Sequence, residues 1–574
     1  MTTMLVLTIL IPLLFAVIVL VRPPEAAKFW ALGGTSVCFL LGAMIVGRFF
    51  SAAGSSTETM QAVASLEWLP ALGLNLSIGV DAIAVLLIAL ALLLGPICVL
   101  ASWTAIPTDR ARLFFGWLLV LQAAMVGVFA ARDLLLFYTC FEFTLLPMFV
   151  LINEFGSTNR KRAATKFFLY TFTGSLIALA GLVYAAWAVA TRASGADLGP
   201  GGFTLDIGVL TQYASAVLTP GEQGLVMAAM LCGFAVKVPL FPFHTWLPLA
   251  HTEAPTAGSV LLAGVLLKLG TYAMYRFVLP LTPVAVYEYA PFIGVLAIIG
   301  IIYAGLICWV QRDIKKLVAY SSVSHLGFCV LGLFALNTSG ITGSVLYMLN
   351  HGLSTGALFL LVGFMYERYH TRDMDQIGGL AAKMPVWSFF MVFFVMASVG
   401  LPGLNGFVSE FLCTMGAFTS YTPWTTDELN GMVGATWGPL GPWFGVAAGT
   451  GVIIAAIYLL YMTSKVVWGT LNEPDGHDDD HSPLPIDLGG REIATLLPLA
   501  ALCLVFGLFP KQTLIDAVEA PINEQIAFIQ QRVTEAPLRD GTLAAEAGSP
   551  TSKASASVLN ESTNAAGRNV GVKP

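Results

Sequence analysis

Charged residues are scarce in this sequence of 574 residues, and their scarcity excludes an ordinary water-soluble protein. Asp, Glu, Lys and Arg together make up 11% of the chain, hydrophobic residues make up 57%, and the mean hydropathy is +0.80. An average soluble domain is about one quarter charged. Since a membrane-spanning helix needs about 20 apolar residues, the length leaves room for about a dozen such helices or more. We therefore expect an all-α polytopic membrane protein.

Basic stretches and the signatures of cofactor sites are missing as well. No basic run is long enough to neutralise a nucleic-acid backbone, so no nucleic acid is expected as a partner. The eight cysteines stand singly without a C-x-x-C pair, and neither a Walker A motif nor a strand followed by G-x-G-x-x-G is present. We expect this chain to hold no nucleotide, flavin or metal. The HDDDH run at 477–481 is interpreted as a solvated acidic loop, with a metal site as the alternative.

Hydrophobic runs bounded by charges, proline or glycine predict fourteen spans. They cover residues 4–21, 29–47, 79–101, 113–130, 133–152, 166–190, 224–248, 255–275, 289–310, 315–336, 341–366, 385–413, 444–467 and 492–510. Lysine and arginine are concentrated in the loops that follow odd-numbered spans, for example at 160–166, and they are few in the other loops. Because such loops stay in the cytoplasm, we expect both termini on the periplasmic side of the inner (plasma) membrane.

Four ionisable residues lie deep within otherwise uncharged spans: Glu142, Lys237, Lys268 and Glu410. Each costs about 2.5 to 3.5 kcal/mol on insertion scales, so we expect a compensating function. One hypothesis is that they form two Glu–Lys pairs that only hold helices together. The favoured hypothesis is a proton or ion relay, because a hydrophobic contact would hold helices at a lower cost.

Three of these charges stand beside residues that interrupt a helix. Pro147 is expected to kink the fifth span near Phe143, next to Glu142. Pro239 and Pro242 follow Lys237 in the seventh span, and the string GLPGLNG precedes Glu410 in the twelfth. Discontinuous helices that carry a charge at the break are typical of ion sites in secondary transporters.

The two broken spans are five helices apart, which predicts an inverted pair of five-helix repeats. We expect helices four to eight at 113–277 and helices nine to thirteen at 283–470. Three helices would precede them at 1–112, and an acidic loop with helix fourteen would follow at 471–510. The remainder, 511–574, is expected to form a surface helix and then, from about residue 536, a disordered tail.

Histidines supply candidate links between the intramembrane charges. His325 and His351 lie in the tenth and eleventh spans, and several Ser and Asn residues surround them. Neutral imidazole accepts and donates protons near neutral pH, and hydroxyl groups with water bridge gaps. His244, inside the break of the seventh span, and His251, near its end, are candidates for proton entry. The alternative for each histidine is a satisfied core residue.

Four motifs over about residues 110–510 resemble signatures of the antiporter-like membrane subunits of respiratory complex I. They are KVPLFPFHTWLPLAHTEAPTAGSVLLAGVLLKLGTY (237–272), DIKKLVAYSSVSHLGF (313–328), MLNHGLSTGALFLLVG (348–363) and GLPGLNGFVSEF (400–411). Within that family the chain is most similar to the M-type subunits. The L- and N-type relatives and many Mrp subunits are expected to carry Lys where this chain has Glu410. The tail beyond about 535 lies outside the family pattern.

The resemblance implies roles for the singled-out residues. Glu142 and Lys237 would be the charge pair of a first half-channel, Lys268 a central relay residue, and Glu410 the terminal proton carrier. His325 and His351 match connecting positions.

The resemblance also implies a non-redox proton-pumping subunit of NADH:quinone oxidoreductase, with L- and N-type neighbours and with FMN, iron–sulfur clusters and quinone in partner subunits. The open alternatives are an Mrp-type cation/proton antiporter subunit, the membrane subunit of a proton-pumping hydrogenase, and a passive scaffold.

Overall fold

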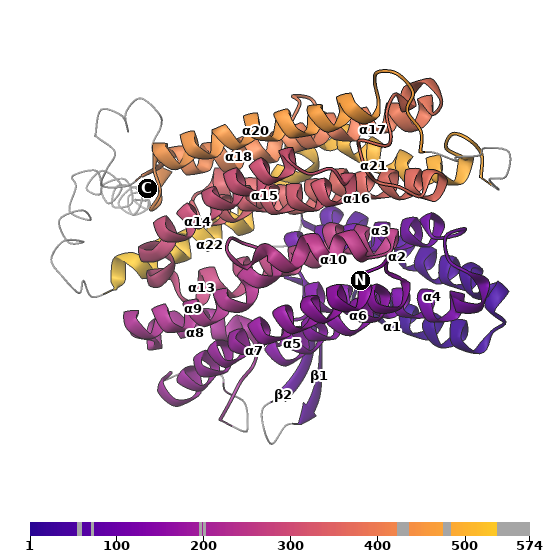
Figure 1. Cartoon of the computed structure of the whole chain (residues 1–574). Coiled ribbons are helices and arrows are strands. Elements are labelled where there is room, and N and C mark those ends of the chain that lie inside the picture. Colours follow the sequence, from indigo (N-terminus) through magenta and orange to yellow (C-terminus); the bar gives the residue numbers. More distant parts are fainter. Residues whose placement is uncertain are drawn as a thin grey trace, which may run out of the picture.

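The computed structural model describes residues 1–53, 60–69, 74–193, 198, 202–421, 436–474 and 484–536. This part of the chain is mostly helical, and the long helices run side by side as one elongated bundle (Figure 1). Twelve helical segments in it are long and apolar enough to cross a membrane. The protein is therefore an all-α polytopic membrane protein, as its composition predicts.

The N-terminal part combines long apolar helices with one hairpin. Its elements are α1 (Thr2–Val21), η1 (Pro24–Ala26), α2 (Ala27–Ala53), β1 (Gln61–Leu69), β2 (Leu74–Val80) and α3 (Ala82–Ala101). The two strands pair antiparallel. The Asp81 carboxylate caps α3 by accepting a hydrogen bond from the backbone N–H of Ala84 at 2.8 Å. The hairpin was not expected from the sequence, which shows no hydrophobic span there.

The next part contains the first expected broken span. Its elements are η3 (Thr108–Arg110), α4 (Ala111–Ala130), α5 (Leu134–Phe143), α6 (Leu145–Phe155), α7 (Arg160–Arg192), α8 (Ile207–Val217), α9 (Pro220–Lys237), η4 (Phe243–Trp246), α10 (Leu247–Glu253), α11 (Thr256–Leu261), η5 (Leu262–Leu266), α12 (Leu267–Ala273), η6 (Met274–Val278) and α13 (Leu279–Leu281). The kink predicted near Phe143 is confirmed, because α5 ends there and α6 begins at Leu145. The break after Lys237 is confirmed as well, since α9 ends at that residue.

The following part contains the second broken span. Its elements are α14 (Pro283–Trp309), α15 (Ile314–Phe334), α16 (Thr338–Tyr369), η7 (Leu380–Ala382), α17 (Pro385–Val399), α18 (Asn405–Thr419), β3 (Ser420–Tyr421), β4 (Thr436–Trp437) and α20 (Pro442–Val466). α17 stops where Gly400 takes a left-handed conformation (φ 81°), and the helical path resumes at Asn405. The predicted interruption of the twelfth span is thus confirmed.

The C-terminal elements are α21 (Gly490–Leu508), η8 (Lys511–Ile515) and α22 (Asp516–Glu535). α22 is amphipathic and buries Val518, Ile522 and Ile529. It packs against α14 and α16. This helix, which was expected at the surface, is thus docked on the bundle by its apolar face. The rest of the expected tail and the HDDDH run lie outside the described residues.

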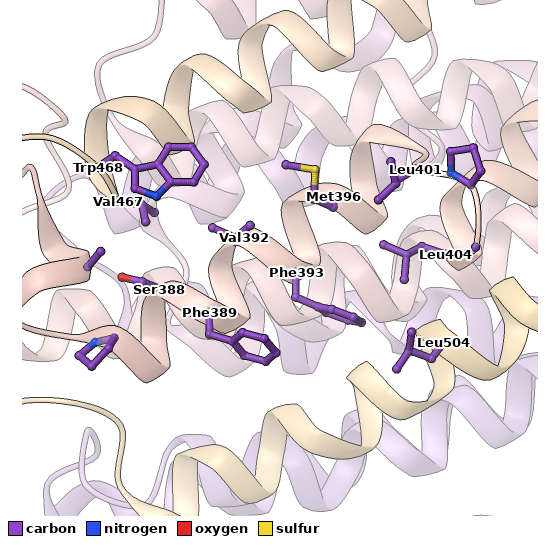
Figure 2. Close-up of a pocket in the computed structure, with 14 residues that line it drawn as sticks. Ser388, Phe389, Val392, Phe393, Met396, Leu401, Leu404, Val467, Trp468 and Leu504 are labelled. Carbon is purple, nitrogen blue, oxygen red and sulfur yellow. The ribbon is translucent and has the colours of Figure 1, made fainter.

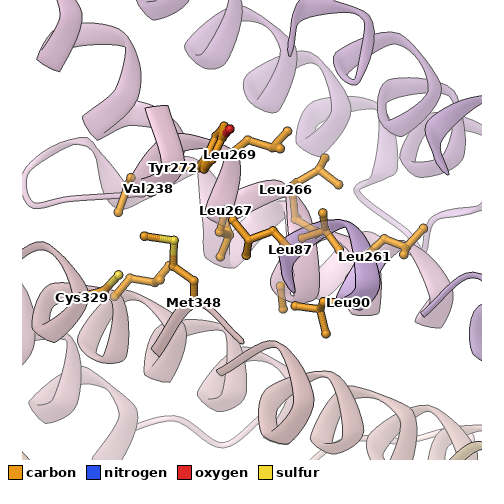
Figure 3. Close-up of a cluster of buried hydrophobic side chains, with 14 of the residues drawn as sticks. Leu87, Leu90, Val238, Leu261, Leu266, Leu267, Leu269, Tyr272, Cys329 and Met348 are labelled. Atoms are coloured by element: carbon orange, nitrogen blue, oxygen red, sulfur yellow. The ribbon is translucent and has the colours of Figure 1, made fainter. Parts of the chain in front are cut away.

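The segment α11 to α13 is, with α16, one of the two most deeply buried spans of the described residues. It is mostly apolar on all sides and is enclosed by the protein over most of its length. In Figure 3, Leu87 and Leu90 of α3 lie beside Leu261 and Leu266 of this segment. Lys268 lies in α12, between the two π-helical turns η5 and η6, so this charge faces protein rather than lipid.

Two cations expected in loops lie instead in buried helical positions. Lys315 is the second residue of α15, and its Nζ donates a 2.5 Å hydrogen bond to the carbonyl of Ala254. Arg368 lies in the last turn of α16 and pairs with Glu492 of α21 at 2.8 Å. α16 extends farther than its predicted span, and hydrogen-bond partners within the protein satisfy both charged groups.

Candidate functional site

A central lysine contacts a histidine in the middle of the bundle. Lys268 of α12 is fully buried, and its Nζ lies 2.7 Å from Nδ1 of His351 on α16. The same Nζ donates to the carbonyl of Ala263 in the preceding π-helical turn. No ion pair of the described residues includes Lys268. A buried ammonium group and an imidazole in contact form a pair between which a proton can pass.

Glu410 lies at the centre of a second polar contact group. Its Oε1 accepts a 2.5 Å hydrogen bond from the hydroxyl of Tyr347 and lies 3.2 Å from Nδ1 of His325. The Tyr347 hydroxyl is also 2.5 Å from that nitrogen. The three side chains come from α18, α16 and α15, and all three are buried. They give a closed, hydrogen-bonded triangle of a carboxylate, a phenol and an imidazole.

The two contact groups lie next to each other. The rings of His325 and His351 are 5.9 Å apart between centroids. Tyr458 of α20 adds its hydroxyl at 3.2 Å from Nε2 of His325. Lys268, His351, His325 and Glu410 therefore follow one another across α12, α16, α15 and α18, and the two imidazoles are adjacent without a direct hydrogen bond between them among the described residues.

The second carboxylate oxygen of Glu410 has no hydrogen-bond partner within the protein. A Cβ built on Gly400 would lie 2.6 Å from this oxygen. Gly400 also has a φ of 81°, where side chains are disfavoured. The glycine at the helix break therefore leaves the space into which Oε2 of Glu410 points.

The Ser and Asn residues around the histidines donate hydrogen bonds mainly to backbone carbonyls. Ser321, Ser322 and Ser354 donate to backbone carbonyls of their own helices, and Ser324 donates to the carbonyl of Ile301. Asn350 donates to the carbonyl of Asn405 at 2.8 Å. These groups stabilise helix packing, whereas the tyrosine hydroxyls join the histidines to Glu410.

Glu142 and Lys237 form a different, looser site between α5 and α9. The Nζ of Lys237 donates to Oγ1 of Thr144 at 3.3 Å and lies 4.3 Å from the ring centroid of Phe141. Glu142 lies within its electrostatic reach. No ion pair within 4.0 Å joins the two among the described residues, and both carboxylate oxygens of Glu142 are buried without a hydrogen-bond partner. The expected charge pair is thus held apart in this conformation.

The two histidines of the first broken span lie apart from these groups. His244 stacks on Phe241, and its Nδ1 has no hydrogen-bond partner. His251 is fully buried and stacks on Phe359 with ring centroids 4.6 Å apart, and neither ring nitrogen is hydrogen-bonded. Neither imidazole makes a direct hydrogen bond to the other candidate relay residues.

Tyr347 and Tyr458 are the polar groups that the sequence analysis missed. Tyr347 stands four residues before His351 and therefore shares its helix face, a signal that could have been used. Tyr458 gave no signal, since it lies in the otherwise ordinary apolar helix α20.

The four intramembrane charges do not form two Glu–Lys pairs. The structure has buried ion pairs elsewhere: Arg368 with Glu492, and Arg276 with Asp81 at 2.5 Å. These pairs have the close contacts and additional hydrogen bonds of a structural anchor. The contrast disfavours the hypothesis that the four charges serve only to hold helices together.

Comparisons with known proteins identify the family of this chain. Residues 131–427 match the family model for NADH:quinone oxidoreductase/Mrp antiporter membrane proteins. The chain is 40% identical to NADH-quinone oxidoreductase subunit M of Rhodobacter capsulatus over 84% of this chain and 87% of the relative. Its structure is similar to a chain of respiratory complex I from Thermus thermophilus, with a TM-score of 0.76, 28% identity, and coverage of 92% and 99% of the two chains.

A chain of the Mrp complex from Dietzia has the same fold, with a TM-score of 0.74 and 20% identity over 93% of this chain and all (100%) of that one. At that identity the likeness concerns the fold alone. The sequence relatives are the more specific finding, since they match most of the chain. The chain therefore belongs to the NADH:quinone oxidoreductase/Mrp antiporter membrane family and, within it, to the M-type subunits of NADH-quinone oxidoreductase.

Proposed function

We propose that this chain translocates protons as the M-type membrane subunit of NADH:quinone oxidoreductase, respiratory complex I. The observation that carries the proposal is the buried succession of Lys268, His351, His325 and Glu410, with contacts of 2.7 Å and 3.2 Å at its two ends. Every member can take up and release a proton. Family membership supplies the context in which such a line is useful.

The route begins at the looser site. Lys237, whose positive charge Glu142 stabilises from a distance, would hold a proton until a change in a neighbouring subunit alters the separation of the two charges. The proton then passes to Lys268, along His351 and His325, and on to Glu410. Tyr347 orients His325 and Glu410 through its hydroxyl. His244 and His251 are proposed as entry points, because Nδ1 of His244 and both ring nitrogens of His251 have no hydrogen-bond partner among the described residues and are free to take up a proton.

The energy for transport would come from partner subunits. Moving one charge against 100 mV requires about 2.3 kcal/mol. We propose that FMN, iron–sulfur clusters and quinone reside in those partners, that L- and N-type subunits flank this chain, and that the chain itself carries no redox centre. We also propose that its Lys- and Arg-rich loops face the cytoplasm, so that both termini face the periplasm.

The first experiment is to tag the chain, purify it from its native membrane in mild detergent, and record an absorption spectrum and NADH:quinone activity. Flavin and iron–sulfur bands with inhibitor-sensitive activity are expected. A colourless preparation that contains only other antiporter-like chains would contradict the assignment and favour an Mrp-type antiporter. Activity with hydrogen in place of NADH would indicate a hydrogenase complex.

The relay itself is tested with Glu410→Gln in the purified complex reconstituted into vesicles. NADH-driven proton uptake should fall strongly, whereas Glu519→Gln on the exposed face of α22 should leave it unchanged. Lys237→Ala tests the scaffold alternative: lost assembly with unchanged protons per electron in the remaining complex would support a purely structural role.

A further inference from the structure

A groove between α7 and α9 has cations at one end and apolar walls along its length. Its volume is about 940 Å³. Lys161, Arg162 and Lys166 line one end, and Leu169, Ile177 and Val236 line the walls. Figure 1 shows α7 along an outer edge of the bundle, where the chain itself leaves the groove uncovered.

The walls of the groove follow from the sequence of α7. Arg162, Lys166, Tyr170, Thr173 and Ile177 recur at helical spacing and form one stripe. From Lys166 to Ile177 the helix rises roughly 16 Å, at about 1.5 Å per residue. That length matches one leaflet, since the hydrocarbon core of a bilayer is about 30 Å thick. The stripe is thus basic at the membrane surface and uncharged through one leaflet.

The floor of the groove is formed by a close crossing of small residues. A Cβ on Gly174 would lie 3.0 Å from the carbonyl of Cys232, and a Cβ on Gly233 would lie 2.7 Å from the carbonyl of Gly174. The backbones therefore touch at this point, and Gly174 and Gly233 place no side chain in the groove.

The cations at the end of the groove are not neutralised by the chain. α7 contains no acidic residue. Among the ion pairs of the described residues none involves residues 160–166. Lys166 donates to the carbonyl of Thr245, a neutral group. A second hollow of about 630 Å³ adjoins this end and shares Lys161 and Arg162, so there is room beside the cations for a bulky anionic group.

A second groove in the protein differs from the α7–α9 groove because it has no charged end. It has about 620 Å³ and lies between α17, the helix break at 401–404, and α21. Figure 2 shows that the labelled residues lining it are almost all apolar, and that Phe389 and Phe393 lie on the side toward the helix that carries Leu504. No charged residue lines it. Its apolar walls suit a hydrocarbon chain, whereas the cations of the α7–α9 groove also suit a negative headgroup.

We propose that the α7–α9 groove binds an anionic phospholipid, with the phosphate at Lys161, Arg162 and Lys166 and an acyl chain along the stripe to Ile177. Basic hollows between helices at a membrane surface are the sites at which such headgroups bind. The groove lies beside the site of Glu142 and Lys237. Val236, which lines the groove, directly precedes Lys237. Gly174, which also lines it, directly precedes Ser175, a polar neighbour of Glu142. The bound lipid closes this side of that site to water.

The test uses the intact complex in phosphatidylcholine vesicles that contain a trace of photoactivatable phosphatidylglycerol or, separately, of photoactivatable phosphatidylcholine. After irradiation, adducts are mapped by peptide mass spectrometry. Adducts should appear at residues 169–177 and 232–236, with phosphatidylglycerol preferred. The variant with Lys161→Gln, Arg162→Gln and Lys166→Gln should lose this preference. The ratio of phosphatidylglycerol to phosphatidylcholine labelling should fall by about fivefold for each cation removed. The matched variant with Arg312→Gln and Lys316→Gln should retain it.

Thr173→Trp provides a second test that leaves the charges in place. The indole should fill the groove and abolish labelling by both lipids. Equal labelling by the two lipids in the wild type, or an unchanged preference in the triple variant, would overturn the proposal. Adducts between the groove and a neighbouring protein chain would also overturn it, by identifying a protein segment as the occupant.

Discussion

The two charged regions of this membrane domain are built in opposite ways. Around Glu410, a histidine and a tyrosine contact the carboxylate at 3.2 and 2.5 Å, and Lys268 contacts the next histidine. Around Lys237, the ammonium group contacts Thr144 and the face of Phe141, and the carboxylate oxygens of Glu142 make no close hydrogen bond among the described residues. The region around Glu410 is already connected by hydrogen bonds, whereas the region around Lys237 is held ready to change.

Helix geometry explains part of this difference. Lys237 is the last residue of α9, and the carbonyl end of a helix stabilises a positive charge without a carboxylate in contact. Glu410 lies in the second turn of α18, beyond the reach of the helix terminus. Its charge therefore depends on hydrogen bonds from other helices. A contact ion pair is not required to hold Lys237, which leaves Glu142 free to act at a distance.

The largest expected effect on proton uptake is at Lys268, which the proposed route places between the Glu142–Lys237 region and the Glu410 region. Lys268→Met removes the ammonium group that contacts His351, so NADH-driven proton uptake should fall by about 100-fold or more, the usual value of a positioned proton-transfer group. Lys511→Met, at an exposed lysine near the C-terminus, is the matched control. Retention of more than half of the pumping by the Lys268 variant would show that the regions work independently.

The second prediction concerns the space beside Glu410. Gly400→Ala places a methyl group 2.6 Å from Oε2 of that carboxylate and strains a backbone with φ 81°. We expect lower stability by at least about 1 kcal/mol, from the left-handed backbone alone, and impaired pumping. Thermal unfolding and proton uptake of the purified complex check both effects. Gly449→Ala, where nothing lies within 4 Å, should be neutral, and equal behaviour of the two variants would refute the assigned role.

A smaller effect is expected from the tyrosines, and it sharpens the description of the connected region. Tyr347→Phe removes the hydroxyl shared by His325 and Glu410, which should slow pumping by about tenfold, the equivalent of one hydrogen bond to a charged group. Tyr458→Phe removes a single contact to His325 at 3.2 Å and should have the weaker effect. The reverse order of the two rates would place the path through Tyr458.

The smallest expected effect is a change in unfolding temperature when the region of Glu142 and Lys237 is altered. Glu142→Gln removes a charge whose two oxygens are buried without partners, so the unfolding temperature should stay unchanged or rise. Glu410→Gln removes a charge held by hydrogen bonds and should lower it, by about 1.5 kcal/mol or more in unfolding free energy. Both variants should reduce pumping. A clear drop in stability for Glu142→Gln would reveal a contact ion pair with Lys237 in the working complex.

Much of the fold follows from local chemistry. Proline and glycine beside Lys237 and before Glu410 predict the helix breaks, because these residues cannot continue a helix without strain or lost hydrogen bonds. The β1–β2 hairpin and α8 escaped prediction, because neither is a long hydrophobic run. The burial of Lys315 and Arg368 also escaped it, since partners distant in sequence satisfy them. The fourteen-span count and the inverted repeat stay predictions.

The sequence by itself determined that this chain is a polytopic membrane protein, that its charges lie at helix interruptions, and which residue types can carry protons. Only the tertiary structure decided which of them touch. Glu410 of α18 is contacted by side chains of α15 and α16, which packing brings to it, whereas Glu142 and Lys237 stay apart. The physical reason is that composition and helix breaking are local properties, whereas hydrogen bonds of about 3 Å depend on how helices distant in sequence pack.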